Sequence, residues 1–105
     1  MNLTDKRCTP CEGGTPPLGE LEIKNFLGQL RTDWEVINNR KIRRQFKFKD
    51  FKTAVAFVNK VADLAESENH HPDIHIYYNR VIIELWTHSI DGLSENDFIL
   101  AAKVE

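Results

Sequence analysis

Apolar residues recur at intervals of three and four in three stretches of the chain, which is the spacing of helices that bury one face. The first stretch covers residues 18–30, the second follows Asp50, and the third follows Ser94. The second is the most regular, with its apolar residues on a single stripe from Phe51 to Ala65. The pattern therefore predicts three helices.

The second and third predicted helices carry capping signals. The carboxylate of Asp50 can accept hydrogen bonds from the free amides of the first turn of the second helix. Because Pro72 requires extended chain before it, this helix should end near Asn69. Ser94 and Asp97 have the spacing of a capping box at the start of the third helix.

Two hairpins are expected between the helices. Residues 34–37 and 41–48 are predicted strands joined by Asn38-Asn39, because asparagine tolerates the positive φ of a tight turn. Residues 73–78 and 81–88 form the second predicted pair.

The second hairpin can be given a register. With Asn79-Arg80 as a two-residue turn, Tyr78 faces Val81 and the ladder continues until His71 faces His88. Opposed residues have Cβ atoms about 4.5–5.5 Å apart, so this register makes two distant histidines neighbours. The face expected to pack on the helices holds Ile74, Ile76, Tyr78, Val81, Ile83 and Leu85. On the other face Ile82 and Trp86 need cover, from the arm or from a subunit contact.

The order helix, two strands, helix, two strands, helix predicts an α+β domain whose antiparallel sheet carries the helices on one face. Residues 1–17 are rich in Pro, Gly and Thr and have little apolar pattern, so we expect an irregular N-terminal arm. The domain itself should cover residues 18–105.

Length and charge narrow the function classes. A chain of 105 residues is one domain. The net charge is -2 with acids and bases interspersed, which argues against direct nucleic-acid binding. No apolar run approaches the ~20 residues of a membrane span, and the N-terminus lacks a signal-peptide pattern. We therefore expect a cytoplasmic protein with no membrane contact.

Cys8 and Cys11 form a CxxC pair that allows three interpretations. A zinc site needs about four ligands, and no second close pair exists. A thioredoxin-like redox site needs a strand before the pair and a helix after it, whereas this pair lies in irregular chain. The interpretation that we favour is a surface arm with two thiols.

The candidate chemistry lies in the histidines, which all fall between positions 70 and 88: His70, His71, His75 and His88. Because imidazole titrates near pH ~6.5, one ring can act as an acid while its neighbour acts as a base. A dehydration requires that pairing, since one group protonates the leaving hydroxyl and another accepts a proton. The cluster therefore indicates an acid–base site.

Several of the candidate residues also have an interpretation that involves no catalytic role. His75 is favoured as an ordinary cross-strand partner of Glu84, and Asp97 can simply complete its capping box. A metal site of His70, His71 and His88 is disfavoured, because adjacent strand residues point to opposite faces.

Residues 66–72, Glu-Ser-Glu-Asn-His-His-Pro, resemble the signature of the pterin-4a-carbinolamine dehydratases. The resemblance continues through an aromatic residue at Tyr78, a histidine at His88 and an aspartate at Asp97, and it covers about residues 18–103. The combined spacing is far more specific than the His-His-Pro triplet alone.

The resemblance implies a four-stranded antiparallel sheet with about three helices on one face. It also implies dehydration of 4a-hydroxytetrahydropterin to quinonoid dihydropterin, in support of tetrahydropterin recycling, with no metal and no organic cofactor. The implied catalytic residues are His70, His71 and His88, of which His70 and His71 are assigned to proton transfer and His88 to positioning. The implied substrate-binding residues are Pro72, Thr87, Ser89, Ile90, Glu66 and Asp97.

The expected partners are a small-molecule pterin and further copies of the chain, in a homodimer or homotetramer. Two alternatives stay open: an interaction module of the coactivator type, and a related dehydration linked to molybdopterin metabolism. Some animal members of the family have a cysteine where this chain has Ile90 and an aromatic residue where it has Ile74. These departures leave the histidines intact and weigh against the coactivator role.

Overall fold

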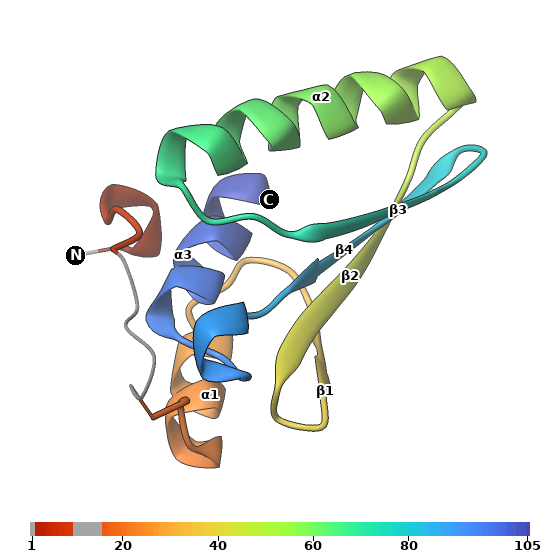
Figure 1. The fold of residues 1–105 in the computed structure, drawn as a ribbon. Helices are drawn as coiled ribbons and strands as arrows, with labels where there is room; N and C mark the ends of the chain where they lie inside the picture. The colour runs from red at the N-terminus through yellow and green to blue at the C-terminus, as the bar shows by residue number, and fades with distance from the viewer. Residues whose placement is uncertain (1, 10–15) are drawn as a thin grey trace.

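The computed structural model describes residues 2–9 and 16–105. Over these residues it contains three α-helices and a four-stranded antiparallel sheet, which confirms the predicted α+β class (Figure 1). In chain order the elements are η1 (Leu3–Asp5), α1 (Glu20–Leu27), β1 (Glu35–Ile37), β2 (Lys41–Lys47), α2 (Phe51–Glu68), β3 (Asp73–Tyr77), β4 (Arg80–Leu85), η2 (His88–Ile90) and α3 (Glu95–Val104).

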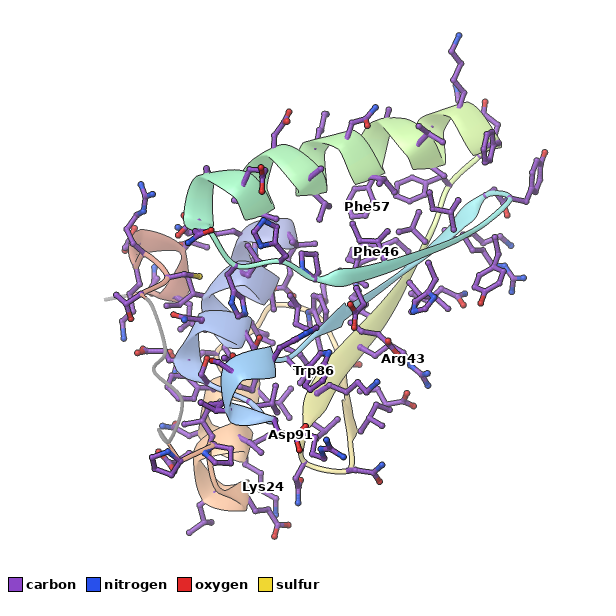
Figure 2. The ribbon with its side chains drawn as sticks, viewed as in Figure 1. Lys24, Arg43, Phe46, Phe57, Trp86 and Asp91 are labelled. Carbon is purple, nitrogen blue, oxygen red and sulfur yellow. The ribbon has the colours of Figure 1, made fainter. Side chains whose placement is uncertain are left out.

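The sheet has the strand order β1-β2-β4-β3, and α2 lies along one of its faces (Figure 1). Along β4 the side chains alternate as a half-buried strand requires: Val81, Ile83 and Leu85 are fully buried beneath the helices. The aromatic ring of Phe46 on β2 packs against Phe57 on α2, with 4.7 Å between ring centroids (Figure 2). The sheet and α2 therefore share one core, to which α3 contributes most of its length.

The predicted caps are confirmed at both long helices. Asp50 Oδ1 accepts a hydrogen bond from the Thr53 amide at 2.8 Å, and the helix ends at Asn69 in the left-handed region with φ 51°. At the start of α3, Asp97 Oδ2 accepts from the Ser94 amide at 2.9 Å. These contacts fix the two chain segments that carry the histidines and their carboxylates.

The predicted register of the second hairpin is wrong by two residues. Tyr77 pairs with Arg80 and Ile74 with Ile83, so the turn is Tyr78-Asn79 and not Asn79-Arg80. The cause is a contact with another element: the Asn79 side chain donates to the Phe48 carbonyl at 3.0 Å, while the Asn79 carbonyl accepts from the Phe48 amide at 2.8 Å. A shift of two keeps the paired strand residues on their predicted faces. The prediction of core positions is wrong for Tyr78, which lies in the turn and is 68% exposed, and for Ile76, which is 40% exposed.

The shift has a consequence for the histidines. Because β4 ends at Leu85, His88 lies outside the ladder in η2, and the predicted cross-strand pairing of His71 with His88 is wrong. Thr87 forms an isolated antiparallel bridge with Gly92, which turns the chain back toward α3.

The described part of the N-terminal segment packs against α3. Leu3 is 3% exposed and joins the core, so residues 2–9 are anchored on the domain. Burial raises the pKa of the Cys8 thiol to about 12, which keeps it protonated at neutral pH. Cys11 lies outside the described residues, so the interpretations of the CxxC pair stay predictions. No helix among the described residues is long and apolar enough to cross a membrane.

Candidate active site

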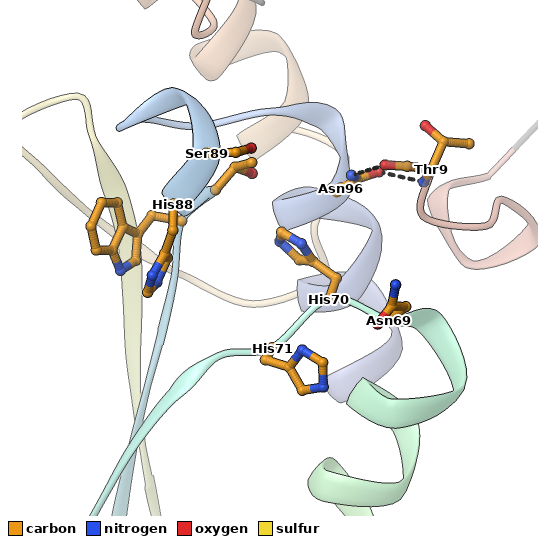
Figure 3. A pocket seen from close by; sticks show the side chains of 9 residues that line it. Thr9, Asn69, His70, His71, His88, Ser89 and Asn96 are labelled. Carbon is orange, nitrogen blue, oxygen red and sulfur yellow. Dashed lines mark hydrogen bonds between the residues drawn. The ribbon is translucent and has the colours of Figure 1, made fainter. Parts of the chain in front are cut away.

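A pocket of about 270 Å³ opens between the end of α2, the start of η2 and the N-terminal segment. It receives side chains from parts of the chain that are far apart in sequence (Figure 3). Its lining residues are Thr9, Asn69, His70, His71, Trp86, Thr87, His88, Ser89 and Asn96. The three histidines predicted from the sequence therefore meet at one cavity.

His70 lies on the closed side of this pocket, where it is held by a buried carboxylate. The distance from His70 Nε2 to Asp97 Oδ1 is 2.6 Å, and Asp97 is fully buried. The other oxygen of Asp97 accepts from the Thr87 hydroxyl at 2.9 Å as well as from the Ser94 amide. One carboxylate thus completes the helix cap and orients a histidine, so the two predictions for Asp97 are compatible.

His71 lies at the open rim. Its Nε2 is 2.5 Å from Oε2 of Glu66, which lies in the last turn of α2. Both side chains are exposed, by 55% for His71 and 77% for Glu66. The same chemical pair therefore occurs twice in the pocket, once buried and once in contact with solvent.

His88 is placed by stacking. Its ring lies 4.0 Å from the Trp86 ring, centroid to centroid, with 30° between the planes. The Trp86 indole is itself fixed by donating its N–H to Asp73 Oδ2 at 3.0 Å. Among residues 2–9 and 16–105, no carboxylate pairs with His88.

The other predicted site residues divide into two groups. Thr87 and Ser89 line the pocket, whereas Glu66 and Asp97 reach it through the histidines that they bind. Pro72 and Ile90 are chain neighbours of lining residues but are not part of the lining. His75 lies outside the pocket and its Nε2 is 3.3 Å from Glu84 Oε1, as its simpler interpretation predicts.

Four lining residues were missed from the sequence. Trp86 had a signal, since a tryptophan on the outer face of the sheet needs a packing partner, and that partner is His88. Asn69 was recognised only as the end of the helix. Thr9 and Asn96 gave no signal, because their place in the pocket depends on the N-terminal segment folding back onto α3.

The arrangement can move protons. A carboxylate on one nitrogen of an imidazole fixes its orientation and stabilises the imidazolium that forms when the other nitrogen accepts a proton. Two such pairs face one cavity, so one ring can donate while the other accepts. Within the described ranges, no three or more His, Cys, Asp or Glu side chains are grouped to hold a metal ion.

Comparison with known proteins gives matches over nearly the whole chain. A family model described as Pterin 4 alpha carbinolamine dehydratase matches residues 16–105. A protein of Alkaliphilus metalliredigens with the provisional name pterin-4-alpha-carbinolamine dehydratase is 52% identical over 104 residues, which cover 99% of this chain and 94% of the relative. A Rickettsia bellii protein with the same provisional name is 50% identical over 104 residues, covering 99% and 92%.

Two solved structures resemble this fold. A Brucella melitensis protein described as a transcriptional coactivator/pterin dehydratase superposes with a TM-score of 0.77 at 42% identity, covering 84% of this chain and 94% of its own. A pterin dehydratase-like protein described as a RuBisCO assembly factor in the alpha-carboxysome superposes with a TM-score of 0.60 at 24% identity, covering 70% and 87%. The second likeness bears on the fold alone.

Proposed function

This chain belongs to the pterin 4 alpha carbinolamine dehydratase family, and on that premise we propose that it removes water from a 4a-hydroxytetrahydropterin to give quinonoid dihydropterin. The observation that carries the proposal is the convergence of His70, His71 and His88 on one pocket. In this role the protein serves tetrahydropterin recycling in the cytoplasm.

The reaction needs one acid and one base at neighbouring atoms. The bond from C4a to the hydroxyl oxygen breaks, and the oxygen leaves as water with a proton from one imidazole. The second imidazole takes the proton of the adjacent nitrogen, and a double bond forms between that nitrogen and C4a. Each such transfer is typically worth about 10²–10⁴ in rate.

We assign the two transfers to His70 and His71. Each has a carboxylate partner, which can stabilise its charged form while the ring exchanges a proton with substrate. We assign His88 to positioning, because its ring is placed by the aromatic face of Trp86 and a flat bicyclic substrate can pack beside such a surface. Thr87 and Ser89, which line the pocket, are proposed as hydroxyl contacts for the pterin. Pro72 and Ile90, which follow lining residues in the chain, are proposed as its apolar neighbours.

The size of the pocket supports a small substrate. Its volume of about 270 Å³ is just below the usual range of ligand pockets, which begins at about 300 Å³, and suits a small bicyclic ring. The dehydration changes no net oxidation state, so the proposed chemistry requires no redox cofactor.

The direct test is stopped-flow decay of chemically generated 4a-hydroxytetrahydropterin with and without the protein. We expect the protein to accelerate the decay by at least about 100-fold at neutral pH, as acid–base catalysis predicts. A decay rate that an equimolar amount of protein leaves unchanged would overturn the proposal. The same assay with a molybdopterin-type carbinolamine separates the related dehydration from this one.

A second candidate function is favoured by one observation, the coactivator description of the Brucella melitensis protein. In that case the fold would act as an interaction module, and a defined partner would bind equally well after His70→Ala and His71→Ala. Loss of dehydration together with retained partner binding in these variants would assign the two functions to different surfaces. Light scattering tests the homodimer or homotetramer that the family suggests.

A further inference from the structure

The N-terminal segment is fastened to the domain by a buried carboxylate. Glu68, at the end of α2, has a side chain only 5% exposed, and its Oε2 accepts from Lys103 Nζ at 2.7 Å. Its other oxygen accepts from the Cys8 amide at 2.9 Å. A buried ion pair contributes little net stability once desolvation is counted, so its consequence here is mainly the fixed position of the segment.

Asn96 fixes the next residue of the segment. Asn96 is 6% exposed, and its Oδ1 accepts from the Thr9 amide at 3.0 Å while its Nδ2 donates to the Thr9 carbonyl (Figure 3). Both polar groups of the Thr9 backbone are thereby bound by one side chain. Two hydrogen bonds to a buried amide leave the backbone of Thr9 little freedom to move.

The contact between Asn96 and Thr9 lies at the pocket. Thr9 and Asn96 both line the cavity that holds His70, His71 and His88. The matched family region begins at residue 16, so the segment that carries Thr9 lies outside it. The pocket therefore has a wall that is supplied by residues before the family domain.

We propose that Thr9 forms a substrate-contacting wall of the pocket, against the bound pterin, and that its neighbour Cys8 anchors this wall through Glu68. Asn96 and Glu68 are positioning residues that act through this wall. The identity of the ligand rests on the proposed function, whereas the existence of the wall rests on the contacts of Glu68 and Asn96.

The first test compares Asn96→Leu with Glu95→Gln. Leucine keeps the branching of Asn96 at Cγ and removes both hydrogen bonds to Thr9. Glu95, in contrast, binds Lys6 at the exposed side of the same segment. We expect Asn96→Leu to raise KM for 4a-hydroxytetrahydropterin about tenfold, the equivalent of one or two lost hydrogen bonds, with kcat within about twofold. Glu95→Gln should leave both constants within about twofold. A KM for Asn96→Leu equal to that of the natural protein contradicts the inference.

The second test does not depend on turnover or on the fold of the Asn96 variant. Thr9→Trp adds bulk at the wall, and Thr4→Trp adds the same bulk at an exposed position of the same segment outside the pocket. We expect Thr9→Trp to weaken binding of 7,8-dihydropterin, measured by calorimetry, at least about fivefold, because added volume clashes with the ligand. Thr4→Trp should bind as the natural protein does.

Equal dissociation constants of the natural protein and Thr9→Trp for 7,8-dihydropterin would show that Thr9 does not contact the ligand. This result would contradict the inference even if the natural protein is an active dehydratase. A natural protein that binds 7,8-dihydropterin in a Thr9-dependent way, yet does not accelerate dehydration, would instead overturn the proposed function and leave the wall in place.

Discussion

The pocket contains the same pair, a histidine and a carboxylate, in two different environments. His70 and Asp97 lie on its closed side. There Asp97 is fully buried, and its two oxygens bind the His70 ring, the Thr87 hydroxyl and the Ser94 amide. His71 and Glu66 lie at the rim, and both are exposed. Burial therefore decides what else each pair does. The buried pair also stabilises the fold, whereas the exposed pair can serve the proposed chemistry without a structural role.

The largest effect should come from removing the buried carboxylate. Asp97→Ala leaves the Thr87 hydroxyl, the Ser94 amide and the His70 ring without their partner in the core. We expect a loss of about 3 kcal/mol in the free energy of unfolding, since unpaired buried polar groups cost about 1–3 kcal/mol each. Urea unfolding measures it, and kcat should fall in the same variant. A loss below about 0.5 kcal/mol would contradict the structural part of the comparison.

Breaking the open pair should separate chemistry from stability. Glu66→Gln keeps the shape of the side chain but removes the charge that stabilises a protonated His71. We expect kcat to fall about tenfold and the free energy of unfolding to change by less than about 0.5 kcal/mol, because exposed ion pairs contribute little. Steady-state kinetics and urea unfolding on one preparation check both. A variant with full kcat would remove Glu66 from the proposed mechanism.

A third carboxylate, that of Glu68, is buried like Asp97 but binds a lysine and a backbone amide in place of a histidine. Hydrogen bonds from Lys103 and from the Cys8 amide hold the pKa of Glu68 below its ordinary value of 4.5. A carboxyl with a lowered pKa in the folded state stabilises the protein above its unfolded pKa, and this stabilisation is lost as pH falls through the folded pKa.

Between about pH 5 and about pH 3, the free energy of unfolding should therefore fall further in the natural protein than in Glu68→Gln. The expected difference between the two falls is about 1 kcal/mol or less. Urea unfolding at the two pH values measures the difference in slope. Other carboxylates, Asp50 among them, titrate in both proteins and cancel in the comparison. The same dependence of the free energy of unfolding on pH in both proteins would show that Glu68 is not bound by Lys103 and the Cys8 amide.

Sequence signals that depend on near neighbours predicted the fold well. Asp50 and Ser94 cap their helices as expected, because a cap involves residues only three positions away. The alternation along β4 correctly gave the buried face. For the site, the crowding of the histidines and the family motif placed His70, His71 and His88 at one pocket.

Signals that depend on distant contacts failed. The turn at Tyr78-Asn79 is selected by Phe48, which belongs to another hairpin, so the spacing of the second hairpin alone gave the wrong register. His88 reaches the pocket through η2, not through the ladder. Thr9 is held at the pocket by Asn96, which lies 87 positions later in the chain. A local sequence pattern cannot predict a contact over such a separation.

The proposed mechanism requires His71 to act on substrate at the open rim of the pocket, and a pair of matched variants tests this requirement. His71 and His75 are both exposed histidines with a glutamate partner, but only His71 lines the pocket. In stopped-flow dehydration of 4a-hydroxytetrahydropterin we predict that His71→Ala lowers kcat at least about 100-fold and that His75→Ala stays within about twofold, with both variants folded. Equal activity of the two variants would contradict the account.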